Sequence, residues 1–397
     1  MNENKMSFFS GALLWLGAAI SIAEILTGAL LAPLGLGLGM AAILAGHLIG
    51  CLLLYFAGLI GAKNKVTAME SVGLSFGRAG SVFFSILNVL QLVGWTAVMV
   101  ISGAKAFRPL YGSSAGFPAD LFWCVVIGLL IVIWLITGLK NLGRLNAVAV
   151  GGLFCLTLVL CVLVFRGESA GEVGGVVSFG LALELSIAMP ISWLPLISDY
   201  TKNTDKPIGF TLASTAGYFA GSCFMYAIGL GGALFAGSSD IVRILQAAGL
   251  GIAAMPIILL STVTTTFLDV YSAGESIHNI DKRLNSRHAA IAVCVVGTLL
   301  AVFIPIEQYE NFLYFIGSVF VPMTAILITD YFILKKRTGG KKFDLLNSCL
   351  WGIGFLLYRV FLGMDTAIGS TIPVFLLVML LDVVSHFIIK KVVRKNV

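Results

Sequence analysis

The chain has 397 residues, of which 59% are hydrophobic and 11% are charged, and its mean hydropathy is +1.02. A soluble domain of this length could not bury so much apolar surface, so the composition excludes a soluble enzyme or binding protein and predicts a polytopic membrane protein. The formal net charge of +6 would suit an acidic partner. However, the basic residues gather on one side of the predicted spans, which explains the charge without a nucleic-acid partner.

Apolar runs predict twelve transmembrane helices, each near the roughly 20 residues that cross a hydrocarbon core. The first run has no small-residue cleavage site after a short core and is interpreted as a retained helix. Seven cysteines lie in these runs without metal or redox spacing and are expected to be reduced packing residues. The predicted spans are 10–33, 40–61, 80–106, 119–138, 144–165, 176–197, 208–235, 249–275, 288–306, 311–334, 346–363 and 367–390.

Basic residues divide between the two sides of these spans as the positive-inside rule requires. With a cytoplasmic N-terminus, 20 of the 25 Lys and Arg residues lie on the cytoplasmic side, and a shift of the helix count by one destroys this pattern. The sequence therefore predicts a multi-pass protein of the cytoplasmic (inner) membrane with both termini in the cytoplasm. The five exceptions are Lys105, Arg108, Arg166, Arg243 and Arg359.

The first span carries one carboxylate, Glu24, near the middle of the apolar stretch from Leu13 to Leu38. A charge at membrane depth is retained mainly where it faces protein or water inside a helix bundle. Small and hydroxyl side chains surround it, which lets other backbones approach and lets the helix unwind locally. We therefore predict a broken first helix that lines a binding site. These neighbours are Gly17, Ala18, Ala19, Ser21, Ala23, Thr27 and Gly28.

The third span places Trp95 after a glycine and midway along the run, with Gln91 one turn earlier. An indole there offers a flat surface for a planar ring, and an amide can donate to and accept from a heterocycle. The position of Trp95 midway along the span argues against a role as an interfacial anchor, and ordinary packing is the alternative to ring binding. His47 in the second span, and His386 and Asp382 in the last, have no obvious partner and are interpreted as structural.

The sixth span has prolines at 190 and 195, on either side of Ile191-Ser192-Trp193. Proline removes a backbone donor, so this span is predicted to be interrupted, with a harmless kink as the alternative. Two interrupted helices that stand five apart are typical of secondary transporters built from inverted repeats. We therefore predict one all-α transmembrane domain over 1–397 with a five-plus-five repeat. The repeats cover about 10–165 and about 176–334, and two further helices lie at about 346–390.

A second polar cluster lies in the eighth span. Helical spacing puts Ser261, Thr264 and Thr265 on one side, with Asp269 one turn beyond. Hydroxyl oxygens beside the free carbonyls of an unwound helix suit a small cation such as Na⁺. The alternative is that each hydroxyl bonds to its own helix. A carboxylate in a low-dielectric site can also exchange a proton, so Asp269 leaves proton coupling open.

Five motifs, in this order and spacing, resemble the nucleobase:cation symporter-1 family over most of the chain. That family includes bacterial cytosine permease, hydantoin transporters and hydroxymethylpyrimidine transporters. The short chain and the acidic pair Glu24 and Asp269 look most like the hydroxymethylpyrimidine (CytX-like) branch. The motifs are GHLIG in the second span, GW in the third, ISWLPLISDYT in the sixth, STVTTTFLDVYSAGESIHNI in the eighth and VFVPMTAILITDYFIL in the tenth.

The resemblance implies a LeuT-like fold, alternating access and a planar ring held between spans 1, 3, 6 and 8, stacked on Trp95. Three departures suggest that ring recognition differs from that of cytosine carriers. Pro190 stands where relatives place a covering aromatic, with Trp193 one turn away; Ser21 is nearest to an expected glutamine; and the amides expected on the eighth span are absent. The implied cation site joins the carbonyls of Gly17 and Ile20 to the hydroxyls of Ser261, Thr264 and Thr265.

A 4-aminopyrimidine presents an amine beside a ring nitrogen, and a carboxylate can bind both groups when the ring is protonated. Glu24 is the first candidate for this role and Asp269 the second. We predict cation-coupled import of hydroxymethylpyrimidine, a thiamine precursor, with cytosine, another nucleobase or a hydantoin as the alternative. No cofactor is expected apart from the coupling ion, which is Na⁺ or H⁺, and no obligate protein partner is expected. The predicted substrate-binding residues are Ser21, Glu24, Gln91, Trp95, Ser192, Trp193 and Asp269.

Two other classes of function fit the sequence less well. An amino-acid carrier on the same architecture would place the substrate carboxylate beside Glu24, which would repel it. An intramembrane enzyme needs paired metal ligands or a nucleophile with its base, and the sequence has no such cluster. A channel needs a repeated filter or charged rings, which are also missing.

Overall fold

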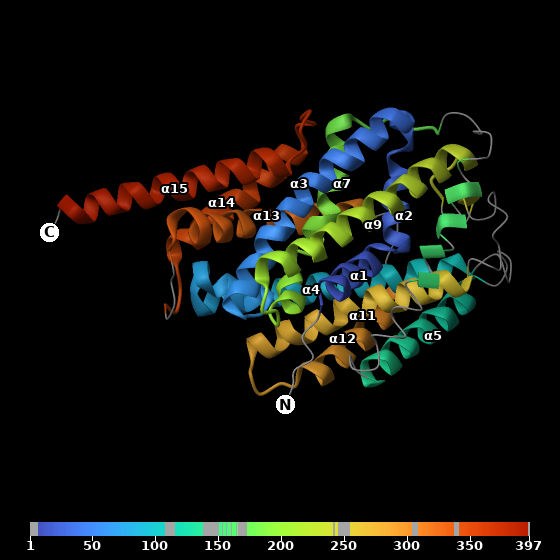
Figure 1. The fold of residues 1–397 in the computed structure, drawn as a ribbon, viewed down its shortest axis with the longest axis horizontal. Helices are drawn as coiled ribbons and strands as arrows, with labels where there is room; N and C mark the ends of the chain where they lie inside the picture. Colours follow the sequence, from blue (N-terminus) through green and yellow to red (C-terminus); the bar gives the residue numbers. More distant parts are fainter. Residues whose placement is uncertain are drawn as a thin grey trace.

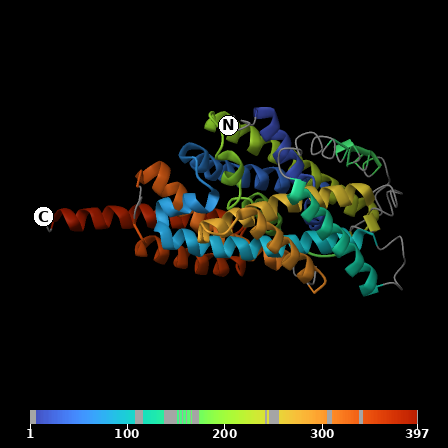
Figure 2. The same ribbon diagram turned by 90° about the horizontal axis from the view of Figure 1, so that it is seen from below.

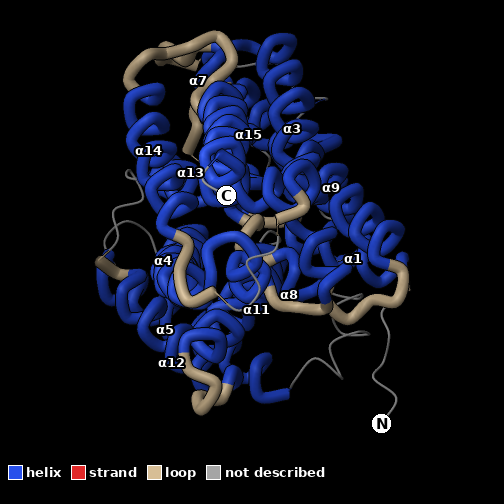
Figure 3. Tube along the Cα trace, turned by 90° about the vertical axis from the view of Figure 1, so that its left-hand side faces the viewer, coloured by secondary structure: helices blue, strands red, loops and turns tan. Residues whose placement is uncertain are grey.

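The computed structural model describes residues 7–107, 116–137, 173–240, 243–244, 255–303, 309–336 and 341–395, and parts of 151–165. Every regular element named in these ranges is helical, and most helices run along the long axis of one bundle (Figure 1; Figure 3 shows the bundle end-on). The helices are α1 (Phe8–Ala19), α2 (Ile22–Leu30), η1 (Ala32–Leu34), α3 (Gly35–Asn64), α4 (Ala68–Ala106), α5 (Gly116–Thr137), α7 (Phe179–Ser192), α8 (Ile197–Thr201), α9 (Pro207–Ala236), α11 (Met255–Ile280), α12 (Ser286–Ala301), α13 (Tyr309–Ile328), η6 (Thr329–Leu334), α14 (Leu345–Leu362) and α15 (Thr371–Lys395).

Seven described helices are long and apolar enough to cross a membrane, and the bent pair α1–α2 is an eighth candidate span. The helices α7 and α12 are apolar but shorter. Most of the predicted fifth span, 144–165, lies outside the described residues. The count of twelve spans and the division into two repeats therefore stay predictions.

The predicted break in the first span is confirmed. α1 ends at Ala19, α2 begins at Ile22, and the two helices are bent by 57°. Between them Ser21 is extended, and its hydroxyl accepts a hydrogen bond from the Glu24 amide at 3.4 Å, as a helix N-cap does. A side chain at Gly28 would meet the Tyr226 backbone, so this glycine lets α2 lie directly against α9.

The predicted interruption of the sixth span is also confirmed, and the break begins after Ser192. α7 continues through Pro190 to Ser192, and a four-residue turn at 193–196 precedes α8. The break leaves backbone carbonyls without helical partners, and side-chain amides of α4 donate hydrogen bonds to them. The Gln91 side chain donates to Ser192 O at 3.1 Å. The Asn88 side chain donates in the same way to Pro195 O at 3.2 Å. These bonds stabilise the open turn in an apolar environment.

The predicted start of the third span is wrong by about three turns. α4 begins at Ala68 instead of residue 80, because Thr67 and Glu70 form a capping box that starts a helix among polar residues. The helix then bends at Gly77, whose φ of 74° favours glycine. Backbone amides just after this bend donate to the carbonyls of Lys341 and Lys342, so the linker before α14 lies against α4.

The helices α14 and α15 pack against α13, and the C-terminal half of α15 projects beyond the bundle (Figures 1 and 2). Glu184 joins α7 to this pair. Its carboxylate, 1% exposed, accepts hydrogen bonds from the backbone amides of Ser370 and Thr371 at 2.7 and 2.8 Å. It also accepts from the hydroxyls of Thr371 and Tyr358. A buried carboxylate at a helix N-terminus therefore fixes α15 relative to the interrupted span.

Candidate functional site

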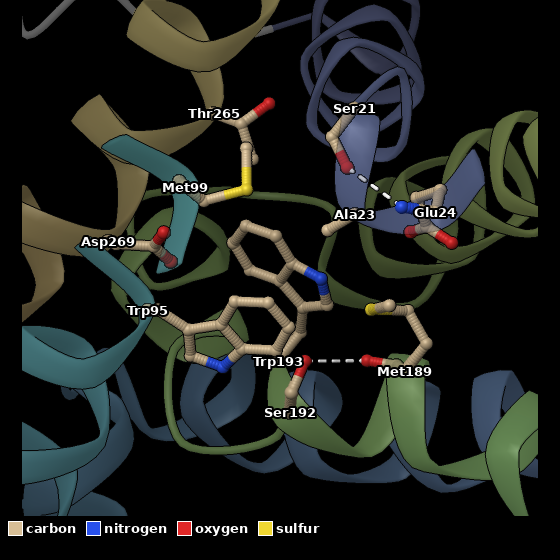
Figure 4. Close-up of a pocket in the computed structure, with 10 residues that line it drawn as sticks. All are labelled: Ser21, Ala23, Glu24, Trp95, Met99, Met189, Ser192, Trp193, Thr265 and Asp269. Carbon is tan, nitrogen blue, oxygen red and sulfur yellow. Dashed lines mark hydrogen bonds between the residues drawn. The ribbon is translucent and has the colours of Figure 1, made fainter. Parts of the chain in front are cut away.

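A cavity lined by buried side chains lies where the two interrupted spans meet α4 and α11 (Figure 4). About 320 Å³ of empty space lies between the atoms around it, and part of this space is open to the outside. No lining side chain is more than 6% exposed, so little of the cavity surface is open to the outside. The lining residues are Ser21, Ala23, Glu24, Trp95, Met99, Met189, Ser192, Trp193, Thr265 and Asp269.

Two indoles border the cavity, Trp95 from α4 and Trp193 from the turn after α7 (Figure 4). Edge-to-face contacts fix both rings. Trp193 packs against Trp15 at 5.4 Å between ring centroids, and Trp95 packs against Phe312 at 5.5 Å. Such contacts orient an aromatic side chain without covering both of its faces. The two indoles therefore offer flat, apolar walls for a planar ring.

The two carboxylates of the cavity have different surroundings, and Figure 4 shows them on opposite sides of the indoles. Glu24 already accepts hydrogen bonds on both oxygens, from Tyr218 at 2.8 Å and from Ser222 at 2.6 Å. Asp269, which is 4% exposed, makes no hydrogen bond or ion pair within the part of the chain that the structure describes. Asp269 is therefore the carboxylate with free acceptors for a ligand.

The polar side chains of three other predicted substrate-binding residues already have hydrogen-bond partners in the protein. Ser192 and Ser21 line the cavity, but the Ser192 hydroxyl donates to the Met189 carbonyl at 2.7 Å and Ser21 caps α2. Gln91 is not a lining residue, because its amide supports the turn after α7. Met99 and Met189 do line it and were not predicted. An apolar residue that lines a cavity cannot be told from the other apolar residues of a membrane helix by its type. The position of Met99, one turn after Trp95, is the only signal in the sequence that could have indicated its role.

The predicted cation ligands come together only in part. The Ser261 hydroxyl donates to the Ile20 carbonyl at 2.8 Å, and the Thr265 hydroxyl lies 3.5 Å from the Ala18 carbonyl. Ala18 was not predicted, although it belongs to the last turn of α1, where helix carbonyls lose their partners. The hydroxyl of Thr264, by contrast, donates to carbonyls of its own helix at 2.8 and 3.1 Å.

The Gly17 carbonyl accepts from the Ile20 amide at 3.2 Å, which closes the end of α1. The remaining oxygens converge at the negative end of the α1 dipole, opposite two hydroxyls of α11. Neutral hard oxygens of this kind suit a small monovalent cation. The donor set therefore fits Na⁺.

Polar contacts join α8 and the residue that follows it to α4 and α11. Lys202 pairs with Glu275 of α11 at 2.6 Å, and both side chains are mostly buried. Asp199 accepts from the Ala68 amide at 2.8 Å and from the Ser272 hydroxyl. These residues were not predicted, since each lies near a helix end where polar residues are common.

A family model described as "Permease for cytosine/purines, uracil, thiamine, allantoin" matches residues 2–347. The chain belongs to this family, the nucleobase:cation symporter-1 family. Cytosine permease of Escherichia coli K12 is 28% identical to this symporter over 335 residues, which cover 81% of this chain and 77% of that protein. Hydantoin permease of Microbacterium maritypicum is 23% identical over 364 residues, which cover 84% and 74%.

The fold agrees with this assignment. The solved structure of Mhp1, a nucleobase-cation-symport-1 family transporter in a closed conformation with bromovinylhydantoin bound, superimposes with a TM-score of 0.79. The match covers 98% of this chain and 93% of Mhp1, with 18% identity. The symporter is thus a multi-pass membrane protein with the predicted LeuT-like fold, and its relatives are permeases and not enzymes. The hydroxymethylpyrimidine branch and the individual site residues stay predictions.

Proposed function

We propose that this symporter imports a 4-aminopyrimidine, with hydroxymethylpyrimidine as the first candidate and cytosine as the second. The observation that carries the proposal is Asp269, a buried carboxylate without a protein partner in the described ranges, which faces the cavity between two indoles. The relatives that transport cytosine and hydantoins support a small planar substrate.

Asp269 can form two parallel hydrogen bonds with an aminopyrimidine. Its carboxylate accepts from the exocyclic amine and from a protonated ring nitrogen, or, as a neutral acid, it donates to an unprotonated ring nitrogen. Uracil and hydantoins present a carbonyl and an N–H at the corresponding edge, and their carbonyl oxygens repel an ionised carboxylate. Both oxygens of Glu24 already accept hydrogen bonds from hydroxyls of α9. Asp269 therefore replaces Glu24 as the first candidate for ring recognition.

The apolar part of the cavity favours hydroxymethylpyrimidine over cytosine. Met99, Met189 and Ala23 contribute apolar side chains, and a thioether can pack closely around a ring methyl group. Cytosine carries a carbonyl at the position of the methyl group of hydroxymethylpyrimidine. A buried carbonyl without a donor costs about 1–3 kcal/mol, so these walls penalise cytosine.

Uptake into proteoliposomes tests this function. Radiolabelled hydroxymethylpyrimidine should enter by saturable transport and without chemical change. Unlabelled cytosine should compete more weakly, and uracil and hydantoin only at much higher concentration. The same ligands should raise the melting temperature of the purified protein in the same order, because a ligand that binds only the native state stabilises it. Preference for uracil or hydantoin over both aminopyrimidines would falsify the proposal.

We further propose Na⁺ as the coupling ion, bound between the end of α1 and α11. The change that tests this site is Thr265→Val, which removes one hydroxyl and keeps the shape of the side chain. Loss of one oxygen ligand should raise the sodium concentration for half-maximal uptake by about tenfold or more, equivalent to about 1.4 kcal/mol. The measurement is initial uptake rate against sodium concentration.

Thr262→Val is the matched control for this experiment. Thr262 is also a buried threonine of α11, but its hydroxyl lies toward Gly103 of α4. Its loss should leave the sodium dependence near that of the unaltered protein. Equal sodium dependence of the Thr265→Val and Thr262→Val proteins would rule out the proposed site. Uptake driven by a pH gradient without sodium would replace Na⁺ by H⁺.

A further inference from the structure

A chain of buried polar side chains leads away from the cavity through Glu24. Its Oε2 lies 2.6 Å from the Ser222 hydroxyl on α9, and that hydroxyl lies 2.6 Å from Nε2 of His47 on α3. The other ring nitrogen of His47, Nδ1, lies 2.9 Å from the Ile43 carbonyl oxygen. All three side chains are 1% exposed or less. His47, predicted to be structural because it has no obvious partner, thus has a partner on each ring nitrogen.

The protonation of Glu24 and His47 follows from counting the hydrogens available to the hydrogen bonds that connect them. A carbonyl oxygen only accepts, so the hydrogen bond from His47 to Ile43 requires a hydrogen on Nδ1. The two contacts of the Ser222 hydroxyl need one hydrogen each, and the hydroxyl supplies only one. If Glu24 were ionised and His47 neutral, one of these contacts would place two acceptors 2.6 Å apart without a hydrogen. One more proton is therefore required, on Oε2 of Glu24 or on Nε2 of His47.

The groups around Glu24 do not supply this hydrogen. The Tyr218 hydroxyl donates to Oε1, the other oxygen of the carboxylate. No Lys or Arg in the described part of the chain forms an ion pair with Glu24 that would satisfy Oε2 instead. The remaining titratable groups facing Glu24 are Cys223 and Tyr226 on α9, Cys51 on α3 and Tyr309 on α13.

The hydroxyls of Tyr226 and Tyr309 form hydrogen bonds with groups other than Glu24. Tyr226 donates to the Leu185 carbonyl at 3.1 Å, and the Tyr309 hydroxyl is paired with that of Thr27 at 3.1 Å. Each thiol of Cys51 and Cys223 is only a weak hydrogen-bond donor, so neither thiol supplies the missing hydrogen. The missing hydrogen is therefore an added proton, taken from solvent and not from a neighbouring side chain.

We propose that Glu24, Ser222 and His47 form a proton-binding site that is filled in this arrangement of the helices. With the proton bound, the three side chains have no net charge, which lowers the penalty for burying a carboxylate at membrane depth. Three separate helices build the site, so it is complete only while α2 and α3 both pack against α9. Separation of α2 from α9 releases the proton to water. This proton is a ligand distinct from the cation proposed at the end of α1.

The pH dependence of thermal unfolding tests this site without any substrate. If the proton is present, the native protein binds more protons than the unfolded chain, so its stability falls as pH rises. The melting temperature of the full-length protein in detergent should therefore decrease by a few degrees between about pH 6 and about pH 9. Glu24→Gln should lose most of this decrease, because its amide donates to Ser222 without taking up a proton. Equal slopes in the two proteins would overturn the proposal.

A second pair of variants keeps the test decisive if Glu24→Gln does not fold. Ser222→Ala removes a hydroxyl donor that favours the ionised carboxylate, so Glu24 should hold its proton to higher pH and the decrease in melting temperature should move to higher pH. Ser214→Ala is the matched control, because this buried serine of α9 lies two turns away and has no hydrogen-bond partner in the structure as described. Its pH dependence should equal that of the unaltered protein. A pH dependence that is the same in the Ser222→Ala and Ser214→Ala proteins would exclude the site.

Discussion

Asp269→Ala is expected to weaken the binding of hydroxymethylpyrimidine and cytosine by about 100-fold or more. The substitution removes two hydrogen bonds at once, and charge-assisted bonds of this kind contribute about 1.5–3 kcal/mol each in a dry site. No other side chain in the described ranges bonds to Asp269, so the fold loses little. The measurement is ligand affinity of the purified protein, by thermal shift or by competition for labelled ligand.

Three further variants test the role of Asp269. Asp382→Ala, the same change at another buried aspartate, on α15 and outside the cavity, should leave ligand affinity unaltered. Asp269→Asn can donate to an unprotonated ring nitrogen and accept from the amine, so it should keep much of the affinity if the ring binds neutral. A large loss in this variant instead indicates a protonated ring. A larger loss for Glu24→Gln than for Asp269→Asn would restore Glu24 as the recognition residue.

The second large effect is expected on stability. Glu184→Ala should destabilise the protein by about 3 kcal/mol or more, because the amides of Ser370 and Thr371 and the Tyr358 hydroxyl lose a buried acceptor. A change of this size should lower the melting temperature by about 5 °C or more. Glu310→Ala is the control, since Glu310 is only half-buried in the first turn of α13. The two variants should differ clearly in thermal unfolding, and equal melting temperatures would contradict the role of Glu184.

Much of the architecture follows from local features of the sequence. The apolar runs place most described helices within a few residues, and the small residues around Glu24 predict the break between α1 and α2. The run of hydroxyls in α11 predicts oxygens opposite that break, and Ser261 and Thr265 do lie there. Membrane insertion explains this success, because backbone hydrogen bonds must be satisfied within each segment and polar residues must face the bundle interior.

The same features do not predict how the polar residues pair. Glu24 and Asp269 have the same chemistry in the sequence, yet only Glu24 has two hydroxyl donors from α9. His47 and Glu184 gain their roles from residues 175 and 186 positions away along the chain. Such pairs form wherever helices that are distant in sequence pack together, and hydropathy has no information about that packing.

The amino-acid sequence alone determined that this chain spans a membrane, interrupts two of its helices and carries carboxylates and hydroxyls at membrane depth. Only the tertiary structure decided which carboxylate faces the cavity without a partner, which hydroxyls reach the free carbonyls of α1, and that Glu24 is connected to His47. The physical reason is that burial is a property of each segment, whereas a hydrogen bond depends on the positions of two groups. Those positions are set by the packing of the whole bundle.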